Sequence, residues 1–170
     1  MRRIVTILIL ILISFLLQTA AFSFENISGM APNLMLILTM SFGIMRGRKE
    51  GLLTGFVCGF LYDIFFGTMI GPFMFLFMII GYSNGAFHKE FLMEDIMMPV
   101  FIISADEVLF DLIEYIFGFL LRNRVNVFFF IKTVFLPRLL MTLLATVIIY
   151  RVLVSINKYL KKRVAESENN

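Results

Sequence analysis

The sequence predicts an all-α integral membrane protein with about six transmembrane helices. The chain has 170 residues, of which 60% are hydrophobic and only 16% are charged, and its mean hydropathy is +0.93. A soluble domain of this size needs a more charged surface. A helix that crosses a bilayer core of about 30 Å takes about 20 residues, so this length allows roughly six spans with short connections. We therefore expect one transmembrane domain over 1–163 and a polar cytoplasmic tail over 164–170.

The composition excludes several classes of function. The single cysteine, Cys58, has no partner for an internal disulfide, and together with the single histidine, His88, it falls short of the usual ligand number of a zinc site. The net charge of +3 is ordinary for a membrane protein with basic cytoplasmic loops and does not indicate nucleic-acid binding. No P-loop, HExxH or CxxC motif occurs. We expect no catalytic, cofactor-binding or metal-binding residues, and a solvated or interfacial His88.

The first predicted span covers 4–22 and follows Arg2 and Arg3. A basic start, an apolar run and small residues near its end also imitate a signal peptide, so cleavage is the alternative to a retained helix. The second span covers 32–45 and begins at Pro32, because a helix start is where the missing N–H of proline costs least. Further apolar runs predict spans over 51–66, 72–87, 99–121 and 128–156.

The distribution of basic residues predicts the orientation, since loops rich in Lys and Arg stay in the cytoplasm. With the N-terminus inside, the cytoplasmic side receives Arg2, Arg3, Arg46, Arg48, Lys49, Lys89, Lys158, Lys161, Lys162 and Arg163. Both termini are then cytoplasmic, as an even number of spans requires. Arg122 and Arg124 would lie on the outer face, so a five-span or re-entrant second half is the alternative.

Small residues recur at every fourth position in the run GLLTGFVCGFLYDIFFGTMIG. The members of this rhythm are Gly51, Gly55, Gly59, Asp63, Gly67 and Gly71. Four helical residues advance by about 40° past one full turn, so the first three glycines form a stripe that lets another backbone approach closely. The stripe is either a packing seam within the chain or the interface for a partner helix. In the second case, Gly55→Leu or Gly59→Leu should block association with the partner.

Asp63 is the one acid in this rhythm and lies about 5 Å from the outer end of its span. The two glycines that follow it, Gly67 and Gly71, bracket a turn. One interpretation is structural, with the Asp63 carboxylate accepting hydrogen bonds from this turn or from a neighbouring helix. The other is a contact with a partner or ligand.

The fifth span carries four acids in an otherwise apolar stretch. They are Asp106, Glu107, Asp111 and Glu114. At about 100° per residue, the last three fall within about 60° of one another, whereas Asp106 points elsewhere. An acid near the membrane centre costs on the order of 3 kcal/mol, so this stripe must face protein or a wet cavity, be partly protonated, or be paired.

Two cations on the sixth span, Lys132 and Arg138, are candidate partners for these acids. If spans five and six are antiparallel, Glu114 and Arg138 each lie roughly 9 Å inside the outer end and can meet. We therefore expect an intramembrane polar network, whose members are Glu107, Asp111, Glu114 and Arg138. A proton relay through the same acids is the alternative to a purely structural contact.

This order of features resembles the rod shape-determining protein MreD family. The resemblance rests on the basic start of the first span, on APNLMLIL opening the second, on the charged RGRKEG turn, and above all on the glycine and aspartate run. The family's small-residue run with one aspartate corresponds to Gly51, Gly55, Gly59, Asp63, Gly67 and Gly71. The family often has an acid after the proline of the second span, where this chain has Asn33. The resemblance covers residues 1–90 best, and the acids of the fifth span have no counterpart in it.

The resemblance implies a non-enzymatic scaffold without cofactor in the bacterial cytoplasmic membrane. Members of this family belong to the lateral cell-wall elongation complex and bind the single-span protein MreC. Through MreC they connect the actin-like protein MreB with the glycan polymerase RodA and a transpeptidase. The resemblance does not fix the oligomeric state, and a homo-oligomer is compatible with it.

The same family is similar in fold to the S components of energy-coupling-factor vitamin transporters. The main alternative function is therefore an S component that binds a vitamin in a cavity open to the outside. Such a cavity would need convergent polar groups and aromatic walls. An intramembrane enzyme is a more distant alternative.

Overall fold

The computed structural model describes residues 2–23, 31–67, 69–89, 97–120 and 127–168, and the regular secondary structure in these ranges is helical. The predicted all-α fold is thus confirmed for this part of the chain. The α-helices are α1 (Arg2–Ser23), α2 (Leu34–Arg46), α3 (Arg48–Phe65), α4 (Pro72–Asn84), α5 (Met97–Glu114), α6 (Val127–Phe130) and α7 (Leu136–Glu168). Three short helical segments of other types are η1 (Gly85–Lys89, 3₁₀), η2 (Tyr115–Leu120, π) and η3 (Ile131–Phe135, π).

Each predicted span overlaps one of these helical segments. The last is longer than predicted, because α6, η3 and α7 follow one another without a break from Val127 to Glu168. Arg122 and Arg124, on which the five-span alternative rests, lie outside the described residues. That six helices cross a bilayer stays a prediction.

One described segment, Val127–Asn157, is long and apolar enough to span a membrane by length and composition. Three of the other helices depart from that standard for identifiable reasons. Helix α2 has 13 residues and is therefore about 20 Å long, shorter than a bilayer core. Helices α3 and α5 have 18 residues each, but each carries four charged side chains.

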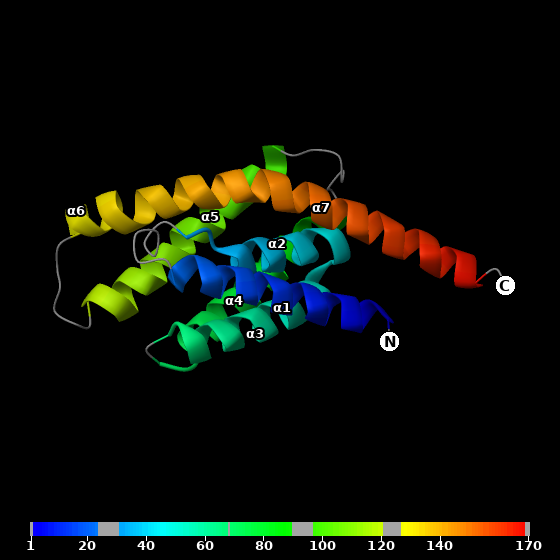
Figure 1. Cartoon of the computed structure of the whole chain (residues 1–170), viewed down its shortest axis with the longest axis horizontal. Coiled ribbons are helices and arrows are strands. Elements are labelled where there is room, and N and C mark those ends of the chain that lie inside the picture. The colour runs from blue at the N-terminus through cyan, green and yellow to red at the C-terminus, as the bar shows by residue number, and fades with distance from the viewer. Residues whose placement is uncertain (1, 24–30, 68, 90–96, 121–126, 169–170) are drawn as a thin grey trace.

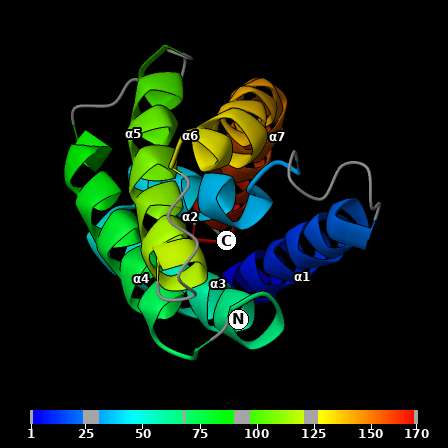
Figure 2. The same ribbon diagram turned by 90° about the vertical axis from the view of Figure 1, so that its left-hand side faces the viewer.

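Helix α2 lies at the centre of the bundle. Figure 2 shows it surrounded by α1, α3, α4, α5 and α7, and it contacts all five. Every residue from Leu34 to Met45 is buried. Helix α1 packs on α2, and Gln18 of α1 accepts a hydrogen bond from the backbone N–H of Met35 (3.0 Å). Gly47, at φ +96°, is the single residue that connects α2 to α3.

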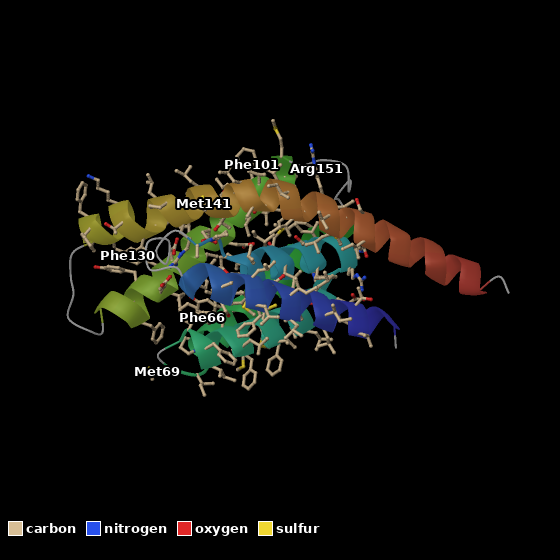
Figure 3. All side chains as sticks on the ribbon, in the orientation of Figure 1. Phe66, Met69, Phe101, Phe130, Met141 and Arg151 are labelled. Carbon is tan, nitrogen blue, oxygen red and sulfur yellow. The ribbon has the colours of Figure 1, made fainter. Side chains whose placement is uncertain are left out.

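The outer faces of the bundle are apolar. Met69 and Phe101 project outward in Figure 3 and are 58% and 72% exposed. Helix α1 exposes Val5, Leu8, Ile9, Leu12, Ile13, Leu16 and Leu17, and α7 exposes Leu136, Leu140, Leu144, Ile148 and Val152. Soluble monomers rarely expose apolar patches of this extent. This surface therefore fits a lipid environment.

Figure 1 shows the N-terminal end of α1 and the C-terminal end of α7 at the same end of the bundle. The final turns of α7 extend beyond the other helices at that end. We refer to this as the terminal end of the bundle, and to the opposite end, where α3 turns into α4, as the distal end.

Candidate functional site

The glycine stripe forms a packing seam between α3 and α4. A Cβ atom added at Gly51, Gly55 or Gly59 would come within 3 Å of the α4 backbone, closer than real Cβ atoms approach other atoms. The neighbours across the seam are the backbone groups of Gly81, Phe77, Phe73 and Met74. Helix α4 therefore occupies the stripe, which supports the packing seam within the chain. That a partner helix binds at these glycines stays a prediction.

Asp63 connects the C-terminal end of α3 to the N-terminus of α4. Its Oδ2 accepts hydrogen bonds from the backbone N–H groups of Gly71 (2.8 Å) and Met74 (2.9 Å), and its Oδ1 accepts one from Phe73 (3.2 Å). The first N–H groups of a helix have no partner within the helix, so this carboxylate caps α4. The structural interpretation of Asp63 is the one that the contacts support. Gly71, which ends the turn and precedes α4, has φ +127°, a backbone conformation that favours glycine.

Polar contacts also hold the C-terminal end of α2. Arg46 donates from Nε to Asn157 of α7 (3.1 Å) and pairs through Nη1 with Glu50 (3.1 Å). The ring of His88 contacts the carbonyl oxygen of Ile44 through Nδ1 (2.7 Å) and is half-buried. These three contacts attach α7, α3 and η1 to the C-terminal end of α2. They fix the position of α2 along the bundle axis.

A second polar cluster lies near the middle of the bundle, and Arg138 of α7 is its only cation among the described residues. Its Nη1 donates to Oδ1 of Asp111 at 2.8 Å, and both side chains are almost fully buried. The same guanidinium also pairs with the carboxylate of Glu114. The structure thus brings Glu114 and Arg138 together, and it adds Asp111 as a second partner. Lys132, the other candidate cation, is exposed on η3.

Glu107 lies deeper in this cluster and is completely buried. Its Oε1 accepts a hydrogen bond from the hydroxyl of Thr142 (3.2 Å), and that hydroxyl accepts one from the backbone N–H of Asn33 (3.2 Å). The Asn33 side chain caps α2 by accepting from the N–H of Leu36 (3.3 Å). The N-terminus of α2, which carries a partial positive charge, therefore points at the acids of α5. We call Glu107, Asp111, Glu114, Arg138, Thr142 and Asn33 the central cluster.

Asp106 turns away from the central cluster, as its helical position predicts. The side-chain amide of Asn84 on α4 donates to its Oδ2 at 2.6 Å. This bond connects α4 to α5 independently of Arg138.

Several polar atoms of the central cluster have no hydrogen-bond partner although they are buried. Among the described residues these are Asn33 Nδ2, Glu107 Oε2, Asp111 Oδ2 and Arg138 Nε. Buried polar atoms are nearly always satisfied, so each exception calls for an explanation such as a bound water, ion or proton. The cluster therefore has unused donors and acceptors in one place.

A groove opens beside the cluster, where α5 and η2 diverge from α6 and η3. Its volume is about 250 Å³, and its walls are mostly apolar. It is lined by Val108, Asp111, Leu112, Tyr115, Val127, Phe130, Ile131 and Phe135. Two of the elements that flank it, η2 and η3, are π-helical, a local geometry that is frequent at functional sites. The groove is smaller than the usual ligand pocket of about 300–1,000 Å³.

Sequence reasoning identified the charged members of the central cluster and missed the neutral ones. Thr142 and Thr146 follow Arg138 at four-residue intervals, so the three side chains lie along one face of α7. All three are buried. This four-residue interval was the feature of the sequence that could have identified the two threonines. Threonine is common in apolar helices, however, and the spacing alone does not distinguish a threonine in a polar cluster from one that only packs.

A family model described as "rod shape-determining protein MreD" matches residues 1–162 of the chain. The match extends past residue 90, through the helices that carry the central cluster. No curated protein matches the chain, and no solved structure does. The expected likeness to the S-component fold therefore has no support from solved structures.

Proposed function

This chain belongs to the rod shape-determining protein MreD family, and we propose that it acts as a non-enzymatic membrane scaffold of the bacterial cell-wall elongation complex. Its role lies in rod-shape determination and in association with the membrane, in keeping with the family. In the proposed mechanism it binds the single-span protein MreC. Through MreC it links cytoplasmic MreB to the glycan polymerase RodA and a transpeptidase.

The family match over 1–162 is the observation that carries this proposal. The fold supports it in two ways. The apolar outer faces of α1 and α7 suit lipid or the helix of a membrane partner. The buried polar contacts of Asp63, Arg46 and Arg138 hold helices to one another, which gives a scaffold a defined shape.

The proposed orientation places both termini in the cytoplasm. The common position of the two ends in Figure 1 supports it, because an even number of crossings returns the chain to its starting side. Arg46 and Arg48 lie at the boundary of α2 and α3, which belongs to that same terminal end. Basic residues favour the cytoplasmic side of a membrane protein.

The MreC helix needs a face other than the glycine stripe, which α4 covers. The open faces include one on α1 around Leu12, one on α3 around Leu53 and one on α7 around Leu144. Each of these leucines is more than half exposed. A single cysteine placed at each position distinguishes the faces, in a chain whose one native thiol, Cys58, is buried and can be replaced by alanine.

The proposal is tested by purifying the tagged chain from its native membranes in a mild detergent and identifying the proteins that accompany it. We expect an MreC-like single-span protein, and we expect rod-shaped cells to become round when this chain is depleted. Disulfide trapping from the three cysteine positions should then favour one face. Unchanged cell shape on depletion, with no single-span partner recovered, would contradict the scaffold.

The same purification tests the transporter alternative. An S component would bring a coupling subunit with paired ATPases. That result would replace the scaffold with a role in vitamin uptake.

A further inference from the structure

The charges of the central cluster do not balance. Glu107, Asp111 and Glu114 lie around a single guanidinium, that of Arg138. With all four groups ionised, the cluster carries a net charge of −2. Buried charges are costly unless they are paired, and the cost is greatest where water is excluded.

The elements around the cluster supply no further cation among the described residues. Helix α7 contributes Arg138 alone, because Lys132 on η3 is exposed. Helix α3 contributes Tyr62, whose ring packs edge-on against Phe110 of α5 with centroids 5.2 Å apart, and η2 contributes Tyr115. A phenol side chain is not a cation, so neither Tyr62 nor Tyr115 offsets the negative charge.

Helices α2 and α4 add only neutral groups on this side. The Asn33 cap at the N-terminus of α2 touches the cluster through Thr142, and Asn84 of α4 is engaged by Asp106, the remaining acid of α5. The α2 terminus offers a partial positive charge of about half a unit, which reduces the imbalance without removing it.

The buried atoms without a hydrogen-bond partner also indicate that the cluster lacks a proton or a cation, independently of the count of charges. Glu107 Oε2 and Asp111 Oδ2 are buried acceptors without donors. A carboxylic acid differs from a carboxylate by one O–H donor. A proton on one of these oxygens therefore reduces the negative charge of the cluster and converts one unpaired acceptor into a donor.

Of the three acids, Glu107 is the least able to remain charged. Asp111 and Glu114 both touch the guanidinium, whereas the hydrogen-bond partner of Glu107 is the neutral hydroxyl of Thr142. The Glu107 side chain is fully buried, whereas Glu114 is 24% exposed. Burial disfavours the ionised form of a carboxyl group that lacks a cationic partner.

The groove gives the cluster a route to the exterior. Asp111 lines the groove, and Glu107 lies one helical turn, or about 6 Å, further along α5. Asp111 is also the partner of Arg138 in the buried ion pair. A proton that enters through the groove thus meets Asp111 before it reaches Glu107.

We propose that the central cluster is a proton-binding site, in which Glu107 holds the proton and Asp111 exchanges it with water through the groove between α5–η2 and α6–η3. Protonation forms one O–H bond on a carboxylate oxygen, and the proton comes from a hydronium ion, whose O–H bond breaks to leave a water molecule. Nothing is oxidised or reduced, and the cluster becomes less negative by one charge. This activity goes beyond the scaffold role and does not depend on any partner.

The proposal is tested by infrared difference spectroscopy on the full chain in lipid nanodiscs. The carbonyl stretch of a protonated carboxyl group is separate from the bands of carboxylates. We expect the folded protein to show such a band at neutral pH and Glu107→Gln to lose it. Glu50→Gln, which removes the partly exposed acid paired with Arg46, should keep it.

Heavy-carbon labelling makes the same assignment without a variant. Label in the glutamate carboxyl groups should shift the band, and label in the aspartate carboxyl groups should leave it in place. A wild-type protein without the band at neutral pH would overturn the proposal. So would a band that shifts only with labelled aspartate.

Exchange with heavy water tests the route. Val108 lines the groove and is 48% exposed, so Val108→Phe should narrow the opening and slow the deuterium shift of the band several-fold. Val152→Phe is the matched control, since Val152 is 53% exposed on α7 and does not line the groove. Equal exchange in both variants and the wild type would overturn the groove as the path.

Discussion

Arg138 is the residue on which the contact between α5 and α7 depends most. Its guanidinium pairs with Asp111 and Glu114, one turn apart on the same face of α5. Breaking a buried ion pair from one side is costly because the other charge stays buried without a partner. Removing Arg138 leaves two acids, Asp111 and Glu114, without their cationic partner. Removing Glu114 leaves the guanidinium paired with Asp111.

Arg138→Met should therefore lower the free energy of unfolding by about 3–5 kcal/mol, and Glu114→Gln should lower it by less. The double variant should cost less than the sum of the two, by at least about 0.5 kcal/mol, because the groups interact directly. Denaturant unfolding in detergent measures all three. Lys132→Met, which removes the exposed cation of η3, serves as the control and should change stability by no more than about 0.5 kcal/mol. Additive losses would count against the coupling of Glu114 to Arg138.

Asn33 has a local role that needs no charge. Its side-chain oxygen caps α2 by accepting from the N–H of Leu36, and its backbone N–H donates to the Thr142 hydroxyl. Asparagine and aspartate are equally good helix caps. An aspartate at this position would add a further negative group close to Glu107, and the neutral side chain avoids that repulsion.

At the scale of elements, α3 and α4 behave as one unit. The glycine stripe brings their backbones together, and the Asp63 carboxylate fixes where α4 begins. Close packing of backbones through small residues is a principal source of helix association in membranes. A side chain in this seam cannot be accommodated by rotation, because its neighbours are backbone atoms.

Gly55→Leu should therefore destabilise the folded protein itself, by about 1–3 kcal/mol or more, as overpacking of a tight core does. Thermal unfolding in detergent measures the loss. Phe56→Leu is the control, because Phe56 is the next residue and is 41% exposed on the outer side of α3. If the Gly55→Leu protein has the unfolding temperature of the wild type and yet fails to bind MreC, the stripe would be part of the partner interface.

The helical rise and the four-residue rhythm were sufficient to predict much of this architecture. They predicted the turn after Asp63. They also predicted that Glu114 and Arg138 lie at the same distance from the ends of two antiparallel helices. They did not show that α4 covers the glycines or that α5 contacts the N-terminus of α2. Those contacts join residues up to 109 positions apart, as Asn33 and Thr142 do, and no local pattern specifies them. The π-helical segments were likewise not predictable, because they depend on how neighbouring helices pack.

At the scale of the whole molecule, the polar contacts of Arg46 and the central cluster lie at different positions along the bundle axis. Arg46 and Asn157 meet at the end of α2 that faces the terminal end, and the central cluster lies at the opposite end of α2. The basic residues at the terminal end, Arg46 and Arg48 among them, predict the orientation in the membrane.

Reporters fused to either terminus should accordingly lie in the cytoplasm. A fluorescent protein that matures only there should be bright at the N-terminus and at the C-terminus, and it should be dark when inserted in the turn between α3 and α4. Equal expression of the three fusions is the control. A dark C-terminal fusion beside a bright N-terminal one would indicate an odd number of crossings and a different second half.

The central position of α2 has a consequence for how the protein is made. Helix α2 is too short to cross a bilayer alone, and the backbone N–H of Asn33 at its N-terminus donates to Thr142, which lies 109 positions later on α7. During synthesis, α2 leaves the ribosome long before α7 exists. Its final position along the bundle must therefore be reached after α7 has been synthesised and has packed against it. A chain shortened before α7 would leave one side of α2 uncovered. We expect the quality-control proteases of the membrane to degrade such a chain.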